Sequence, residues 1–169
     1  MPNTFTLIAS STVGSGGAST IDFTSIPGTY TDLCLKLSTR DNRANPANGV
    51  WLRPNGSSTN LSGKQLYGTG ASVASQSQTT GIIGVEPSST TTASTFSNIE
   101  VYIPNYTSSN NKSATSDSVQ ENNATSAEQW LVAYLWSNTA AITSITIIPE
   151  ASASFVQHST AYLYGVKNA

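Results

Sequence analysis

The sequence predicts an all-β domain, an antiparallel β-sandwich or a jelly roll. Short runs in which apolar and polar residues alternate recur along the chain, and this period of two residues is typical of strands covered on one face. Gly, Pro and Asn separate the runs, as turns between short strands require. Of the 169 residues, 37% are hydrophobic and only 9% are charged, which fits one domain with one core.

In the first half, the second run ends at Pro27 and Gly28, where proline sets φ and glycine allows a turn. In the third run, Leu33, Leu35 and Leu37 share one face and alternate with Asp32, Cys34 and Lys36. The strands expected here span residues 4–8, 20–24, 32–37 and 49–53.

Residues 55–95 are rich in Gly, Ser and Thr, with few apolar residues among them. They predict one or two short strands inside long loops, and so long a loop region in a compact domain usually indicates function or disorder. We therefore divide the chain into an N-terminal strand with a flexible Gly/Ser-rich arm, residues 1–19, and a β-sandwich domain, residues 20–169.

In the second half, the run 129–136 is apolar on both faces, with Trp130, Tyr134 and Trp136 opposite Leu131 and Leu135. A helix is the alternative there, but the Trp, Tyr and Val content favours a strand. Such a strand is expected in a sandwich core or beneath a neighbouring subunit. The expected strands span residues 96–103, 111–120, 129–136, 142–148, 154–157 and 161–166; residues 111–120 are expected at an edge or with one covered face.

The side chains that carry most enzyme chemistry are scarce. His158 is the only histidine and Cys34 the only cysteine, and they have no metal-ligand spacing. No nucleophile elbow surrounds a serine, and residues 41–45 resemble a calcium loop poorly because Arg43 interrupts it. We predict no catalytic residue, no metal ligand and no cofactor, and a protein that is not an enzyme.

Charge and hydropathy limit the partners. The net charge is −2, the isoelectric point is about 5.2 and the 7 cationic residues are scattered, so no nucleic-acid surface is expected. No apolar run approaches the ~18 residues of a membrane span, and no secretory signal is recognised. We expect a protein made in a cytoplasm, without a membrane partner.

Apolar side chains on two strands are the candidates for a subunit or capsid interface. The first strand precedes a glycine-rich segment, residues 14–17, and could act as an arm; an ordinary strand followed by a loop is the alternative. Tyr67 and Tyr106, expected in loops, are the candidates for a ligand surface. The interface candidates are Phe5, Leu7, Ile8, Trp130, Tyr134 and Trp136.

Several stretches resemble a group of small virion structural proteins of tailed bacteriophages, frequent in phages of cyanobacteria. The resemblance covers most of the chain from Thr20 to Val166 and rests on structural motifs. These motifs are IDFTSIP (residues 21–27), YTDL (30–33), IEVYIPNY (99–106), NKS (111–113), ENNAT (121–125), LWSNTAAI (135–142) and STAYLYGV (159–166).

The resemblance implies a β-sandwich or jelly-roll protein on the virion, most often a capsid decoration (cement) protein or a tail-fibre component. It implies the major capsid protein as partner, the capsid surface as location and synthesis in the host bacterial cytoplasm. It also favours a homo-oligomer, a trimer, because capsid lattices offer quasi-threefold sites. A tail-fibre or tail-tip adhesion module that binds host-surface glycan is the alternative.

Overall fold

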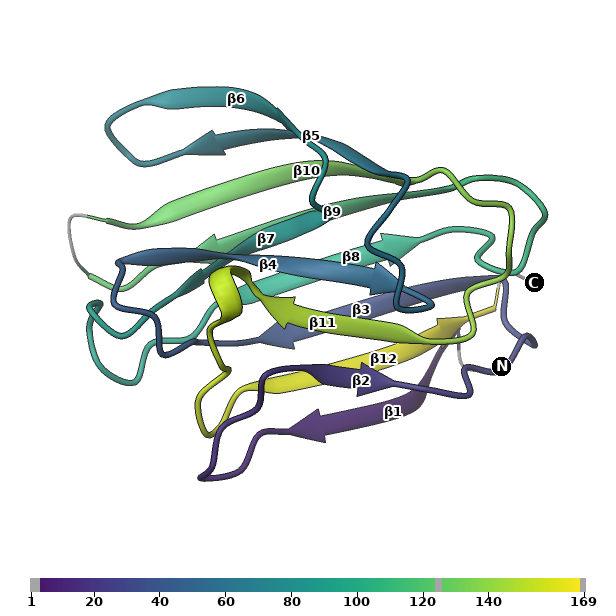
Figure 1. Cartoon of the computed structure of the whole chain (residues 1–169), viewed down its shortest axis with the longest axis horizontal. Coiled ribbons are helices and arrows are strands. Elements are labelled where there is room, and N and C mark those ends of the chain that lie inside the picture. The colour runs from purple at the N-terminus through teal and green to yellow at the C-terminus, as the bar shows by residue number, and fades with distance from the viewer. Residues whose placement is uncertain (1–3, 124–125, 168–169) are drawn as a thin grey trace.

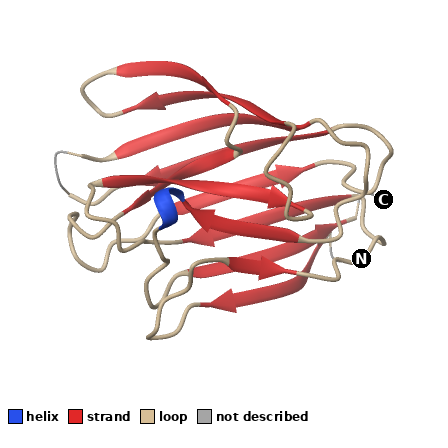
Figure 2. Ribbon diagram, in the orientation of Figure 1, coloured by secondary structure: helices blue, strands red, loops and turns tan. Residues whose placement is uncertain are grey.

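Two antiparallel sheets form two layers of a β-sandwich in the computed structural model, which describes residues 4–123 and 126–167. One sheet has eight strands and the other has four, and the smaller lies in front of the larger in Figure 1. Strands make up almost all the regular structure in Figure 2, apart from the single 3-10 turn Glu150–Ser152. The predicted all-β sandwich is confirmed, whereas the jelly-roll connectivity stays a prediction.

The described residues form twelve strands, which we name in spatial order. The large sheet consists of β1 (Phe5–Thr12), β12 (Thr160–Val166), β3 (Asp32–Ser38), β8 (Asn98–Ile103), β9 (Lys112–Gln120), β10 (Glu128–Trp136), β5 (Leu61–Gly68) and β6 (Val73–Gln78). The small sheet consists of β2 (Ile21–Phe23), β11 (Ile145–Pro149), β4 (Ala47–Pro54) and β7 (Ile82–Pro87).

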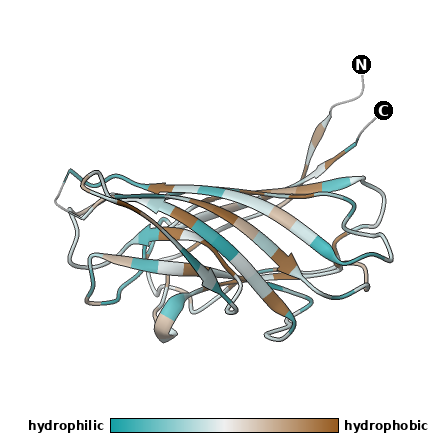
Figure 3. Ribbon diagram, turned by 90° about the horizontal axis from the view of Figure 1, so that it is seen from above, coloured by the Kyte–Doolittle hydropathy of each residue, from teal (hydrophilic) through white to brown (hydrophobic). Residues whose placement is uncertain are grey.

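The core lies between the two sheets. From the large sheet, Leu35 and its cross-strand neighbour Val101 are fully buried, as are Leu52 and Ile145 from the small sheet. Each such side chain contributes about 1.5–3 kcal/mol by leaving water. Figure 3 views the two layers edge-on and shows apolar residues recurring between polar ones along the strands. The alternation that predicted strands therefore also separates core from surface.

Strands β9 and β10 are central in the large sheet. Burial alternates residue by residue along β9, so its one-sided character is confirmed, but it lies between β8 and β10 and not at an edge. The strand prediction for residues 129–136 is confirmed by β10, and the helical alternative is excluded.

The prediction of one or two strands in residues 55–95 is wrong, because β5, β6 and β7 all lie there. Strands β5 and β6 form a hairpin that extends the large sheet at the top of Figure 1, and β7 lies at one edge of the small sheet. The hairpin escaped prediction because β6 reads VASQSQ and has only one large apolar residue to mark a period.

The N-terminal segment is a strand followed by a turn. Strand β1 pairs along its length with β12, and the backbone N–H of Gly17 donates to the Gly14 carbonyl at 3.1 Å. Gly17 has φ +71°, and a Cβ there would lie 2.9 Å from the Phe155 carbonyl oxygen. In place of an arm, the chain therefore has an edge strand, and the strand expected at residues 154–157 is reduced to bridges at Phe155.

Candidate interaction surface

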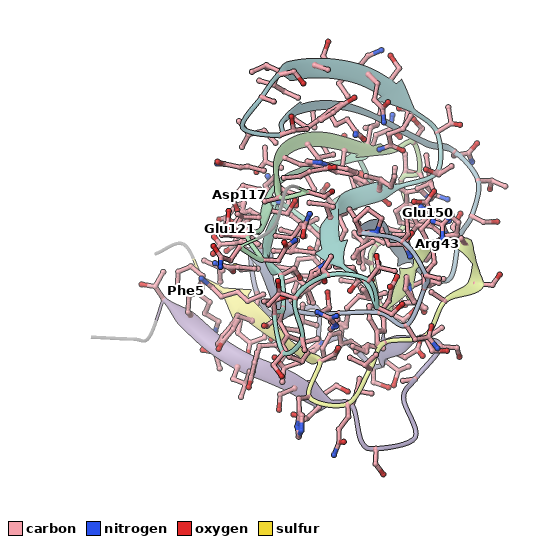
Figure 4. All side chains as sticks on the ribbon, turned by 90° about the vertical axis from the view of Figure 1, so that its left-hand side faces the viewer. Phe5, Arg43, Asp117, Glu121 and Glu150 are labelled. Atoms are coloured by element: carbon pink, nitrogen blue, oxygen red, sulfur yellow. The ribbon has the colours of Figure 1, made fainter. Side chains whose placement is uncertain are left out.

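The face of the large sheet turned away from the small sheet, here called the outer face, is the largest open surface that the fold creates. On β10 the outward residues are Gln129, Leu131, Ala133 and Leu135, while Val132, Tyr134 and Trp136 point into the core. Figure 4 shows the molecule from the side, with Phe5 and Asp117 on the side of the large sheet and Arg43 and Glu150 on the opposite side.

Four exposed aliphatic side chains gather at one end of the outer face, over β6, β5, β10 and β9. We call this group the apolar patch. Leu131 and Leu66 lie directly opposite one another in the sheet, which places their Cβ atoms about 5 Å apart. The exposed fractions are 75% for Val73, 52% for Leu131, 48% for Leu66 and 38% for Val119. Exposure of this extent on neighbouring strands marks a surface that another molecule covers.

Hollows surround the two leucines. One of about 420 Å³ is lined by Leu66, Leu131 and Ala133, because the small side chain of Ala133 leaves space between its larger neighbours. A second, of about 170 Å³, lies on the other side and is lined by Leu66, Leu131 and Val73. The patch therefore has both protruding side chains and spaces that could receive them.

A charged strip crosses the middle of the outer face. Lys36 of β3 forms an ion pair with Glu100 of β8 at 2.5 Å, and the bond to Glu100 raises the pKa of Lys36. Asp117 of β9 lies directly opposite Glu100 on its other side. Both partners of the ion pair are about half exposed, so the pair contributes only about 0–1 kcal/mol to stability.

A second apolar group lies at the other end of the outer face, on β1 and β12. We call it the N-terminal patch: Phe5 and Leu7, 49% and 52% exposed, and Tyr162, 38% exposed. Phe5 contacts Tyr164 edge-on, with ring centroids 6.4 Å apart. Phe5 and Leu7, predicted from the sequence, are thus accessible, and their role in an interface stays a prediction.

Several candidate residues are not on this surface. Ile8 is at the point where the pairing of β1 shifts register, and it packs against the core, so its prediction as an interface residue is wrong. Tyr134 and Trp136 are only 3% and 1% exposed, because the small sheet covers that face of β10, and Tyr134 donates to the Leu52 carbonyl. Tyr106 is fully buried and donates to the Pro27 carbonyl, so it belongs to no ligand surface.

Trp130 and Tyr67 form a half-buried aromatic pair. They are opposite one another on β10 and β5, with ring centroids 5.9 Å apart, and the Trp130 indole N–H donates to Glu128 at 2.7 Å. The residues that the sequence reasoning missed are Leu66, Val73 and Val119. Only the strand pairing brings them beside Leu131, so no local signal could have grouped them.

A pair of acids is buried between the layers. Asp41 and Glu86 are both fully buried; Asp41 accepts from the Asn48 amide and, at 3.1 Å, from the Arg43 backbone N–H. Neither Glu86 oxygen has a hydrogen bond within the described part of the chain. Burial, and then the charge of Asp41, raise the pKa of Glu86 well above its usual value, while the nearby Thr39 hydroxyl lowers it. We expect Glu86 to be protonated near neutral pH.

The described residues contain no group of three or more His, Cys, Asp or Glu side chains that could hold a metal ion. His158 is exposed in a turn at φ 75°, and burial raises the pKa of the Cys34 thiol to about 11. No helix among residues 4–123 and 126–167 is long and apolar enough to cross a membrane.

Comparison of the chain with models of protein families, with curated proteins and with solved structures finds no match. The interpretation of function therefore rests on the residues and surfaces described above and on the resemblance of the motifs.

Proposed function

We propose that the protein is a virion structural protein of a tailed bacteriophage, which decorates the capsid and bridges neighbouring major capsid subunits. The observation that carries the proposal is the presence of two apolar patches at opposite ends of one face. Leu7 and Leu131 are five strands apart in the large sheet, or about 24 Å at the usual strand spacing. A protein that joins neighbours in a lattice needs two separate contact areas of this kind.

The polar surface suits the same role. Charged residues are only 9% of the chain, and Ser and Thr occupy many exposed positions, such as Ser75 and Ser77 on β6. Contacts made by apolar packing and neutral hydrogen bonds are less sensitive to salt than ion pairs are. A decoration protein built this way would stay soluble alone and still bind a shell in many copies.

Copy number in purified virions tests the proposal. A stained gel, calibrated against the major capsid protein, is expected to show on the order of hundreds of copies, as the symmetry of a capsid lattice requires. A handful of copies per particle would discard the decoration role.

The surface that contacts the capsid can be tested separately with undecorated capsids. We expect Leu7→Ser to lower binding, because it removes the apolar centre of the N-terminal patch. Leu66→Ser is the matched control, since Leu66 is almost equally exposed, at 48% against 52%. Equal binding by Leu7→Ser and the unaltered protein would exclude the N-terminal patch as the capsid contact.

A tail-fibre or tail-tip module that binds host-surface glycan is the second candidate. The Tyr67–Trp130 pair favours it, because aromatic faces beside a carboxylate, here Glu128, are suited to sugar rings. The burial of Tyr106 argues against the wider aromatic groove that the sequence predicted. Binding of the purified protein to host polysaccharide, lost in Tyr67→Ala, would favour this candidate over decoration.

A further inference from the structure

We propose that two copies of this chain associate face to face through the apolar patch, around a twofold axis parallel to the strands between β5 and β10. The inference concerns only the chain itself and does not depend on the bacteriophage assignment. It follows from the register of the four strands, the distribution of their charges and the size of the face.

The register makes the patch self-complementary. A row of side chains crosses the face as Ser75, Leu66, Leu131 and Asp117, and a neighbouring row as Val73, Gly68, Gln129 and Val119. Rotation about the axis exchanges β5 with β10 and β6 with β9. It therefore places Leu66 over Leu131 of the partner subunit and Val73 over Val119 of the partner subunit, so each exposed aliphatic side chain meets another.

The charges on the face obey the same symmetry. Lys64 of β5 and Asp117 of β9 carry the only charges among the outward residues of these four strands. Within the described residues neither forms an ion pair; Lys64 instead donates to Ser77, away from β9. The rotation brings Lys64 diagonally beside Asp117 of the partner subunit, and it does so twice. The association would thus pair both charges that the single chain leaves without an opposite charge.

The size of the face predicts a reversible dimer. Four strands about 4.8 Å apart and six to nine residues long present roughly 400–550 Å² per copy. Two copies would bury about 1,000 Å², at the lower limit of specific interfaces. We therefore expect a concentration-dependent equilibrium between monomer and dimer. A twofold axis also replaces the trimer favoured by the resemblance, which rested on lattice symmetry and on no residue.

Sedimentation equilibrium of the full chain over a wide concentration range is the test. The apparent mass should rise from that of one chain, 17.7 kDa, towards twice that value. Leu131→Asp places one carboxylate from each copy in the apolar contact, and we expect it to weaken association at least about tenfold. Tyr162→Asp is the matched control, because Tyr162 is exposed on the same outer face but outside the patch, and it should dimerise like the unaltered protein.

Charge reversal gives a test that a folding defect cannot imitate. Lys64→Glu and Asp117→Lys should each weaken the dimer about 2- to 10-fold, and the two together should restore it, because the exchanged charges attract again. A protein that stays monomeric at all concentrations, that forms trimers, or whose dimer is unaffected by Leu131→Asp would overturn the proposal. Failure of the double variant to recover would overturn the proposed axis.

Discussion

The two faces of β10 differ in what covers them, although both are apolar. On the inner face, Trp136 and Tyr134 are 1% and 3% exposed beneath the small sheet. On the outer face, Leu131 is 52% exposed, and no element of the described chain lies over it. A strand with one covered apolar face is sufficient for a sandwich. The second apolar face therefore does nothing evident for the fold, and this is why we assign it to contacts with another molecule.

The largest expected effect separates the two faces by stability. Trp136→Ala should lower the free energy of unfolding by about 3–5 kcal/mol, since it leaves a cavity in the core, and the melting temperature by about 6–20 °C. Leu131→Ala should change the stability of the monomer by less than about 0.5 kcal/mol, because its side chain is half exposed. Thermal unfolding of both variants in dilute solution, where the monomer is favoured, measures the difference. Equal losses would show that the outer face also belongs to the core.

The buried acid gives a pH dependence that belongs to the inner side alone. The pKa of Glu86 in the folded protein lies above its value of about 4.5 in the unfolded chain. The folded state thus binds the proton more tightly, and this contribution to stability is complete below pH 4.5 and is lost as the pH rises through the folded pKa.

We expect Glu86→Gln to keep the shape of the side chain and remove this loss. Urea unfolding at pH 5 and at pH 8 should show that the unaltered protein loses more stability with rising pH than the variant does. Parallel pH profiles for the two proteins would contradict a protonated Glu86.

The smallest expected effect concerns the charged strip on the outer face. Lys36→Met removes the ion pair with Glu100 and should change the free energy of unfolding by no more than about 1 kcal/mol, with a smaller change at high salt. Urea unfolding at low and high ionic strength measures it. A loss of several kcal/mol that persisted in salt would mean that this part of the outer face stabilises the fold.

The alternation of residues predicted the strands well but not what lies over them. It divided residues 129–136 into the two faces that β10 shows. The large aromatic residues suggested an interface, whereas Tyr134 and Trp136 fill the core because the second sheet lies over them. The apolar patch could not be predicted, since Leu66 and Leu131 meet only through a hairpin whose second strand is mostly Ser, Gln and Ala.

The self-association of the outer face is the central claim, and cross-linking between single-cysteine variants tests it most directly. Val73 and Val119 of one chain are separated by three strand spacings, about 14 Å, but would face one another between copies across sheets about 10 Å apart. Cys34 will not interfere, because its thiol is buried and its pKa is raised to about 11. We predict that a short thiol cross-linker joins a mixture of Val73→Cys and Val119→Cys into a covalent dimer and joins neither variant alone. No dimer from the mixture, or equal dimer from either variant alone, would contradict the account.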